Sequence, residues 1–218
     1  MKKIAVIGAG GINSWVVEHL ASLRRIFFTK EMLFVKIYDN DEVEEKNILR
    51  ESQNFTADDL MEKKAEVLAK KHGFDFANML ITEDNINELD DYDDIILGVD
   101  NHKARKLIYE HCIRKRKYLI DLRAQGTRMS YFVLEPQTLS AEEQDKLIEK
   151  YNQKFFSNPD VMERKGSCQL DADIKNDHIE NANKVISFMG IFCIYLKWLR
   201  EEQLSTNEWE FVYWWMLK

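Results

Sequence analysis

The sequence predicts an α/β fold in which a mostly parallel, Rossmann-like sheet is flanked by helices. Three observations lead to this prediction. Strand and helix signals alternate from the first residues onward. The first β-branched run, residues 3–7, stops at a glycine cluster and is followed at once by helical spacing. The intervening helices are long enough to return the chain for right-handed βαβ crossovers.

Each element follows from a local pattern. The expected strands are residues 3–7, 33–38, 79–82, 95–99, 118–122 and 130–134. The expected helices are residues 12–23, 58–71, 102–113, 141–156 and 181–200, the second of them capped by Asp58 and Asp59. Residues 157–179 are polar and read as a loop, and the 141–156 helix is expected at the periphery.

The C-terminal tail alternates Trp209, Phe211, Tyr213 and Trp215, which predicts a strand returning to the sheet. Linkers and repeats are not evident in the sequence. We therefore expect one domain over residues 1–218. It would combine a nucleotide-binding core, residues 1–135, with a C-terminal part, residues 136–218, that adds a cysteine-containing loop, a long helix and a strand.

Composition narrows the class of protein. The 218 residues are 45% hydrophobic and 11% aromatic, which suffices for a sizeable core. With 31 basic against 38 acidic residues, the net charge is −7. This balance argues against broad electrostatic binding to nucleic acid or to an anionic membrane.

The chain ends and apolar runs give no targeting signal. Two lysines and a short apolar run open the sequence, too little for a signal peptide, so a cytoplasmic protein is expected. The longest apolar stretch, residues 185–199, contains Lys197 and is shorter than the roughly 20 residues that span a bilayer. A buried helix is the better interpretation.

The cysteine pattern excludes two kinds of site. Cys112, Cys168 and Cys193 are odd in number, widely spaced and never arranged as CxxC. A disulfide framework or a four-cysteine zinc site is therefore not expected, and neither is zinc. Cys193 lies among large apolar residues and is expected in the core, while Cys112 is expected to be structural.

A glycine-rich turn is the first feature that points to chemistry. Gly8, Gly10 and Gly11 stand between a predicted strand and a predicted helix. Glycines let the backbone approach phosphates, and a helix N-terminus offers free N–H groups. Asn13 stands where the dinucleotide fingerprint has its last glycine, and this departure weakens an NAD interpretation.

The end of the second strand narrows the choice of nucleotide. Asp39 stands where a ribose-binding carboxylate belongs, a feature that NAD and ATP sites share. Asn47 and Arg50 follow the second strand at a spacing that the cofactor site of a dehydrogenase does not require. Arginine offers a fork of donors to phosphate, so the pair favours an enzyme that handles a triphosphate.

These residues together resemble a known family. The runs Asp39-x-Asp41-x-Val43 and Asn47-x-x-Arg50 resemble the motif of the ThiF/MoeB/ubiquitin-activating superfamily. Lys64 matches the lysine that follows this motif, and Asp100-Asn101 matches the pair that closes the fourth strand; Lys63 is one residue away from that register. Members of the family use Mg-ATP to adenylate the C-terminal glycine of a ubiquitin-like or sulfur-carrier protein.

The resemblance implies roles for individual residues. Gly11 would contact phosphate, Asp39 the ribose, and Asn47 and Arg50 the phosphates, while Lys64 would neutralise phosphate charge and Asp100 would hold Mg²⁺. The implied nucleotide-binding set is Gly8, Gly10, Gly11, Asp39, Asp41, Asn47, Arg50, Lys64, Asp100 and Asn101, and the implied catalytic set is Arg50, Lys64 and Cys168. A small β-grasp protein as partner and a homodimer are also implied.

Cys168 has two interpretations. It occupies the loop where many members of the family keep a cysteine that captures the activated carboxyl, and Arg164 and Lys165 could lower the pKa of its thiol. The alternative is an ordinary loop thiol.

The sequence departs from the family at Glu51, which replaces a glutamine, and at the start, where an arginine-bearing helix is missing. The expected function is ATP-dependent adenylation of a carrier protein. The alternatives are a catalytically weak binding scaffold, a relative acting on a peptide or small cyclisation substrate and, as a further option, an NAD-dependent oxidoreductase.

Overall fold

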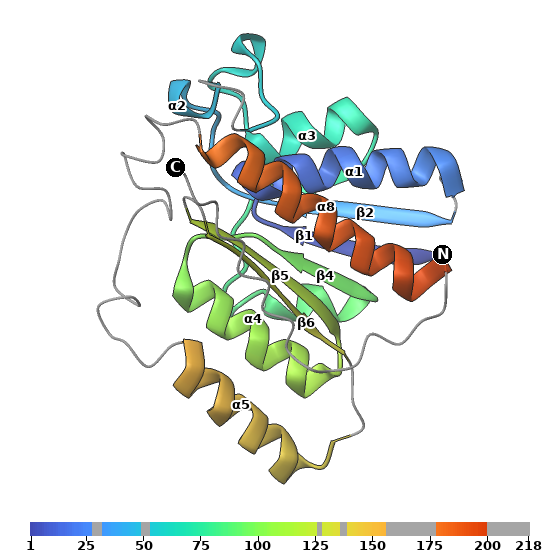
Figure 1. Ribbon diagram of the computed structural model, residues 1–218, viewed down its shortest axis with the longest axis vertical. Helices are drawn as coiled ribbons and strands as arrows, with labels where there is room; N and C mark the ends of the chain where they lie inside the picture. Colours follow the sequence, from blue (N-terminus) through green and yellow to red (C-terminus); the bar gives the residue numbers. More distant parts are fainter. Residues whose placement is uncertain (28–31, 49–52, 126–127, 136–138, 156–177, 200–218) are drawn as a thin grey trace, which may run out of the picture.

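The computed structural model describes residues 1–27, 32–48, 53–125, 128–135, 139–155 and 178–199 (Figure 1). The predicted strand in the tail, most of the predicted polar loop and the predicted site residues Arg50 and Cys168 lie outside this part of the chain.

Six strands form one twisted sheet in the order β3-β2-β1-β4-β5-β6. They are β1 (Lys2–Ile7), β2 (Leu33–Tyr38), β3 (Asp75–Ala77), β4 (Asp94–Leu97), β5 (Tyr118–Gln125) and β6 (Arg128–Leu134). The first five run parallel and β6 pairs antiparallel to β5. The strand order reverses between β1 and β4, and in open α/β sheets ligands bind in the crevice at such a point.

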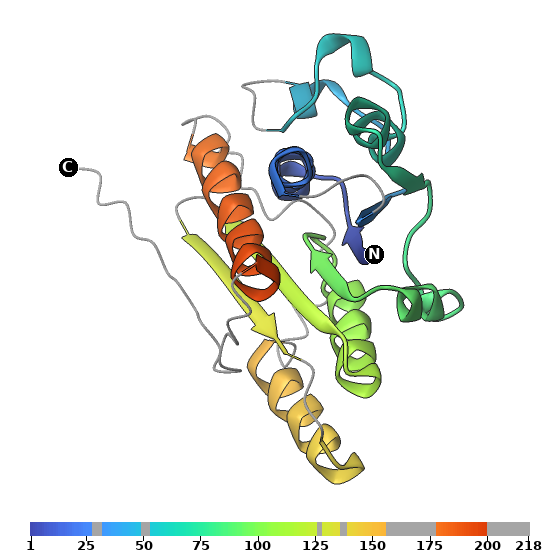
Figure 2. The ribbon, with the colours of Figure 1, turned by 90° about the vertical axis from the view of Figure 1, so that its right-hand side faces the viewer.

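Helices cover both faces of the sheet. They are α1 (Gly11–Phe27), α2 (Glu45–Ile48), α3 (Lys64–His72), α4 (His102–Lys115), α5 (Ala141–Phe155) and α8 (His178–Leu199), with 3₁₀ turns η2 (Ala57–Asp59) and η3 (Ile86–Asp91). One face packs against α1, α3 and α8, and the other against α4 and η3, with α5 outside α4. In Figure 2, where α1 is seen nearly end-on, α8 lies beside it.

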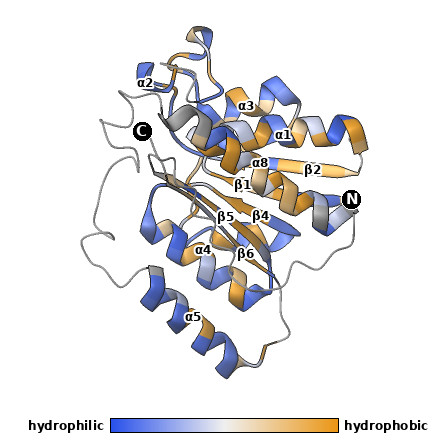
Figure 3. Cartoon of the chain, in the orientation of Figure 1, coloured by the Kyte–Doolittle hydropathy of each residue, from blue (hydrophilic) through white to orange (hydrophobic). Residues whose placement is uncertain are grey.

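The central strands are apolar on both faces because helices cover both. Along β1, Ile4 and Val6 join the core beneath α1, whereas Ala5 and Ile7 join the core beneath α4. Near-continuous apolar runs of this kind are expected in a covered parallel sheet. Figure 3 shows the apolar β2 and β4 inside and the hydrophilic α5 at the periphery, as the sequence predicts.

The predicted third strand is wrong. Residues 79–82 form no strand; β3 is Asp75–Ala77, which pairs with the end of β2. The chain enters a turn at residues 83–85 directly after this segment, and Asn85 ties the segment to that turn: its Nδ2 donates to the Leu80 carbonyl and its Oδ1 accepts from the Thr82 N–H. The apolar residues that suggested a strand divide between the core and solvent: Ile81 is buried and Leu80 is exposed.

The predicted start of the second long helix is also wrong. Asp59 belongs to the short turn η2, and α3 begins only at Lys64. Met61 has a φ of +69°, and its N–H and the Glu62 carbonyl bond to the backbone of Val43. This contact with a distant segment keeps residues 60–63 out of the helix.

The predicted core position of Cys193 is confirmed, and Cys112, predicted to be structural, is also a buried free thiol. None of the described helices has the length and apolar character that crossing a bilayer requires.

Candidate active site

The glycine loop lies at the point where the strand order reverses. Gly8 has a φ of +87°, which disfavours any side chain, and a Cβ there would lie 3.0 Å from Val99 Cγ1. The loop therefore packs closely against the segment that follows β4. A Cβ at Gly10 would meet nothing within 4 Å, so this part of the loop borders open space. Gly11 begins α1, whose N-terminal N–H groups point out of the helix.

Asp39 fastens the end of β2 to the glycine loop. Its side chain is largely buried; Oδ2 accepts a 2.6 Å hydrogen bond from the Ala9 N–H and Oδ1 accepts one of 2.7 Å from the Asp41 N–H. Burial raises the pKa of the Asp39 carboxyl, while the two N–H donors act in the opposite direction. The structure thus joins two predicted site elements, Asp39 and the glycine loop.

The two neighbouring lysines differ in position. Lys64, the first residue of α3, has a side chain only 8% exposed, and its Nζ lies 3.3 Å from Asp41 Oδ2. The Lys63 side chain is 39% exposed and contacts Glu42 and the Asn40 carbonyl. Both lysines therefore contact the segment after β2, but only the Lys64 side chain is buried there, and its backbone N–H also bonds to the Asp41 carbonyl at 3.0 Å.

Asn47 is buried on the short helix α2. Its Oδ1 accepts a 2.8 Å hydrogen bond from the Glu44 N–H, so the side chain shapes the turn that leads toward residue 50. Arg50 itself, like Cys168, is not among the described residues.

The two predicted site residues after β4, Asp100 and Asn101, differ in their structural roles. Asp100 is exposed and directly follows Val99, which touches the glycine loop. The Asn101 side-chain oxygen accepts hydrogen bonds from the N–H groups of Lys103 and Ala104 and so caps α4. Asp100 therefore lies at the crevice between β1 and β4, held there by a capped helix.

Sequence reasoning missed a buried charged cluster beside this segment. Asp121 on β5 is fully buried; it contacts Arg105 and Arg123 and accepts a 2.9 Å hydrogen bond from Tyr109. Arg105 also donates to the Val99 carbonyl, which ties the segment after β4 to β5. A carboxylate within the apolar run that opens β5, residues 118–122, was the available signal, because such a group needs buried partners.

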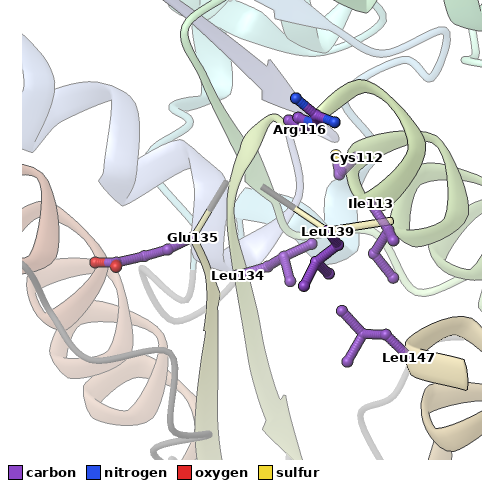
Figure 4. A pocket seen from close by; sticks show the side chains of 7 residues that line it. All are labelled: Cys112, Ile113, Arg116, Leu134, Glu135, Leu139 and Leu147. Carbon is purple, nitrogen blue, oxygen red and sulfur yellow. The ribbon is translucent and has the colours of Figure 1, made fainter. Parts of the chain in front are cut away.

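A small pocket elsewhere is unconnected with these groups. It lies between α4, β6 and α5 and has a volume of about 10 Å³, which is room for one water molecule (Figure 4). Cys112, Ile113, Leu134 and Leu147 line it. Burial raises the pKa of the Cys112 thiol, which keeps it protonated. This pocket is a packing gap of the core.

Comparisons with known proteins show the fold and the family. A search of curated proteins finds no match. Among solved structures, Escherichia coli MccB with ATP is similar, with a TM-score of 0.65, 16% identity and coverage of 94% of this chain and 58% of that chain. The microcin C7 biosynthetic enzyme MccB with N-formylated MccA gives a TM-score of 0.62, 16% identity and coverages of 94% and 59%.

PaaA gives a TM-score of 0.63, 15% identity and coverages of 97% and 73%. These likenesses confirm the Rossmann-like fold, and the chain spans less than two thirds of the MccB chain. The sequence model of the ThiF family matches residues 1–189, which is most of the chain. The protein therefore belongs to the ThiF family.

Proposed function

We propose that this protein is an ATP-dependent adenylyltransferase that activates the C-terminal glycine carboxylate of a ubiquitin-like or sulfur-carrier protein. The observation that carries the proposal is the grouping of polar elements at the carboxyl ends of β1, β2 and β4. An open glycine loop, the Asp39 carboxylate, Lys64 and the exposed Asp100 all border the crevice where the strand order reverses. Membership of the ThiF family supports the same reaction.

In this proposal the nucleotide lies across the glycine loop. The loop and the N-terminus of α1 bind phosphate through backbone N–H groups and the helix dipole. Asp39 binds the ribose, and Asn47 and Arg50 bind the phosphates. Asp41 places Lys64, whose ammonium group neutralises charge on the β- and γ-phosphates.

The reaction needs alignment and charge neutralisation more than a general base. A carboxylate oxygen of the substrate forms a bond to the α-phosphorus, and the bond from that phosphorus to the bridging oxygen breaks. Pyrophosphate leaves with the electron pair, and no proton has to move. The cations of Lys64 and Arg50 would then stabilise the charge that develops on the phosphates.

Asp100 fits a role as a magnesium ligand. Mg²⁺ in nucleotide sites is held by one or two carboxylates together with substrate phosphates and waters, so a single exposed carboxylate at the crevice suffices. When bound, the ion neutralises phosphate charge. The protein's part is to hold the Asp100 carboxylate in place through the cap of α4 and the contact of Val99 with the glycine loop.

Cys168 is proposed to act after adenylation. Its thiolate would attack the acyl carbon of the adenylate, form a thioester and release AMP. Conversion of Cys168 to alanine would then leave pyrophosphate exchange intact and abolish the covalent carrier adduct.

We also propose a homodimer, supported by the exposed face of α8. Val185, Phe188 and Phe192 are 49%, 56% and 41% exposed, and the two phenylalanine rings stack at 6.5 Å. Contiguous exposed apolar side chains of this kind mark association surfaces. Light scattering at high micromolar concentration tests this directly, and a monomer contradicts it.

Isotope exchange between pyrophosphate and ATP tests the proposed function. Exchange is expected only with a β-grasp carrier that ends in glycine. Asp100→Ala should abolish it, whereas Asp84→Ala, which removes an exposed carboxylate in the turn between β3 and η3, should not. Exchange driven by a short peptide instead of a carrier would move the substrate class to peptides. ATP binding without any exchange would favour a scaffold, and binding of NAD in place of ATP would favour an oxidoreductase.

A further inference from the structure

Asn13 replaces the last glycine of the dinucleotide fingerprint, and its side chain fills the place that the glycine leaves open. It lies on the first turn of α1 and is fully buried. Its Nδ2 donates to the carbonyls of Ile7 and Gly8, at 2.9 Å in both cases. These carbonyls end β1 and begin the glycine loop, so one amide group holds the loop from its inner side.

The same side chain contacts the segment after β4. A Cβ on Gly98 would lie 2.6 Å from both Cγ and Oδ1 of Asn13, a distance at which something must shift. Gly98 also donates its N–H to the Ile7 carbonyl at 3.0 Å. The Asn13 amide is therefore packed between the glycine loop and the backbone of Gly98. Position 98 therefore requires a glycine, whereas position 13, where the dinucleotide fingerprint has a glycine, carries a side chain.

Two residues beyond Gly98, the chain reaches Asp100. Asn13 thus links the loop proposed to bind phosphate with the segment proposed to hold the metal. We propose that Asn13 is a positioning residue that fixes the spacing between these two segments, and that its hydrogen bonds to Ile7 and Gly8 set the affinity for ATP. This inference rests on the proposed function. Buried polar groups need partners, and the partners of the Asn13 Nδ2 are backbone carbonyls at the start of the nucleotide loop, whereas its Oδ1 packs against Gly98 with no hydrogen-bond partner among the described residues.

The test measures ATP affinity by calorimetry and melting temperature without nucleotide. Asn13→Gly should weaken ATP binding about tenfold, because two hydrogen bonds to the loop are lost. Asn13→Ser, which keeps one hydroxyl donor, is a milder variant that should weaken binding less. Ser187→Ala is the control: Ser187 is equally buried, and among the described residues its Oγ donates to the Lys184 carbonyl within α8. It should leave ATP affinity unchanged.

Gly98→Ala separates positioning from packing. In the wild-type background the new methyl group meets Asn13, so both the melting temperature and ATP affinity should fall. In the Asn13→Gly background the methyl group has room, so Gly98→Ala should cost far less melting temperature. ATP affinity should nevertheless stay at the Asn13→Gly level, since the hydrogen bonds remain absent.

Three results overturn the inference. The first is an ATP affinity of Asn13→Gly within twofold of the wild-type value. The second is an equal loss of melting temperature for Gly98→Ala in the wild-type and Asn13→Gly backgrounds. The third is full recovery of ATP affinity in the double variant. Failure of the wild-type protein to bind ATP would instead overturn the proposed function, and would be seen before any variant is made.

Discussion

An Asp–Lys pair lies at each end of the parallel strands, and the two pairs differ in burial. We call the end at which the strands finish the carboxyl edge and the end at which they start the amino edge. At the carboxyl edge, Asp41 is 64% exposed at its side chain and Lys64 reaches it from a buried stem. At the amino edge, Asp94 is fully buried and pairs with Lys197 of α8, whose Nζ lies 3.8 Å from the centroid of the Tyr118 ring. In the first pair the carboxylate is open to solvent, whereas in the second the carboxylate is enclosed by packing and the Lys197 side chain is 26% exposed.

This difference separates charges that serve the fold from charges that are available for chemistry. A fully buried carboxylate such as Asp94 has lost its hydration, and its charge stays balanced only while its cation remains. A pair with one exposed carboxylate can exchange a partner for a phosphate at small cost. Position in the fold, more than residue type, therefore decides which lysine is a site candidate.

The largest expected effect is at the amino edge. Lys197→Met leaves Asp94 buried without its cation and should lower the free energy of unfolding by about 3 kcal/mol at neutral pH. ATP affinity should not change. Chemical denaturation measures the first and calorimetry the second. Lys146→Met, on the exposed surface of α5, is the matched control and should leave stability nearly unchanged.

The same variant should alter the pH dependence of stability. Burial raises the folded-state pKa of the Asp94 carboxyl above its unfolded value of about 3.9, and Lys197 opposes that rise. Protonation therefore favours the folded state, and this stabilisation is lost as the pH rises through the folded-state pKa. Without Lys197 the pKa rises further, so the stability deficit should be larger at pH 7 than at pH 4. A deficit independent of pH would contradict this account.

The next effect is at the carboxyl edge. Lys64→Met should slow pyrophosphate exchange about 100-fold, or about 2.7 kcal/mol in the transition state, because a preorganised cation is lost. The neighbouring Lys63→Met should change the rate little, since Lys63 contacts Glu42 and the Asn40 carbonyl. Equal losses for the two variants would remove the distinction between the lysines.

The smallest effect concerns Asn101. Asn101→Ala removes the cap of α4 and should cost about 1 kcal/mol of stability. Asn101→Asp keeps a capping oxygen and should preserve stability, yet weaken ATP binding by placing a second carboxylate beside Asp100. Denaturation and calorimetry on both variants separate capping from nucleotide contact. Unchanged ATP affinity in Asn101→Asp would leave Asn101 a cap alone.

The sequence alone predicts the features that depend on local residue patterns. The alternation of apolar runs placed five of the six described strands, and the glycine loop stood where a strand meets a helix. Prediction from the sequence fails where contacts between distant segments determine the local structure. The start of α3 depends on the contact between Met61 and Val43, and the position of β3 depends on pairing with β2. Neither contact has a local signature.

The same limit applies to the candidate site. Motif spacing singled out Asp39 and Lys64, and both lie at the carboxyl edge. The cluster around Asp121 went unnoticed because its partner Arg105 is 16 residues away in the chain. Asn13 was visible in the sequence only as a departure from a fingerprint. Its packing against Gly98 required the three-dimensional arrangement.

Hydrogen exchange with and without Mg-ATP tests the central claim that the carboxyl edge alone is the nucleotide site. Amides of residues 8–13 and 98–101 should gain protection when the nucleotide binds. Amides at the start of β4 and in the last turns of α8, at the opposite edge, should exchange at unchanged rates. Protection at the amino edge, or bound ATP without protection of the glycine loop, would contradict the account.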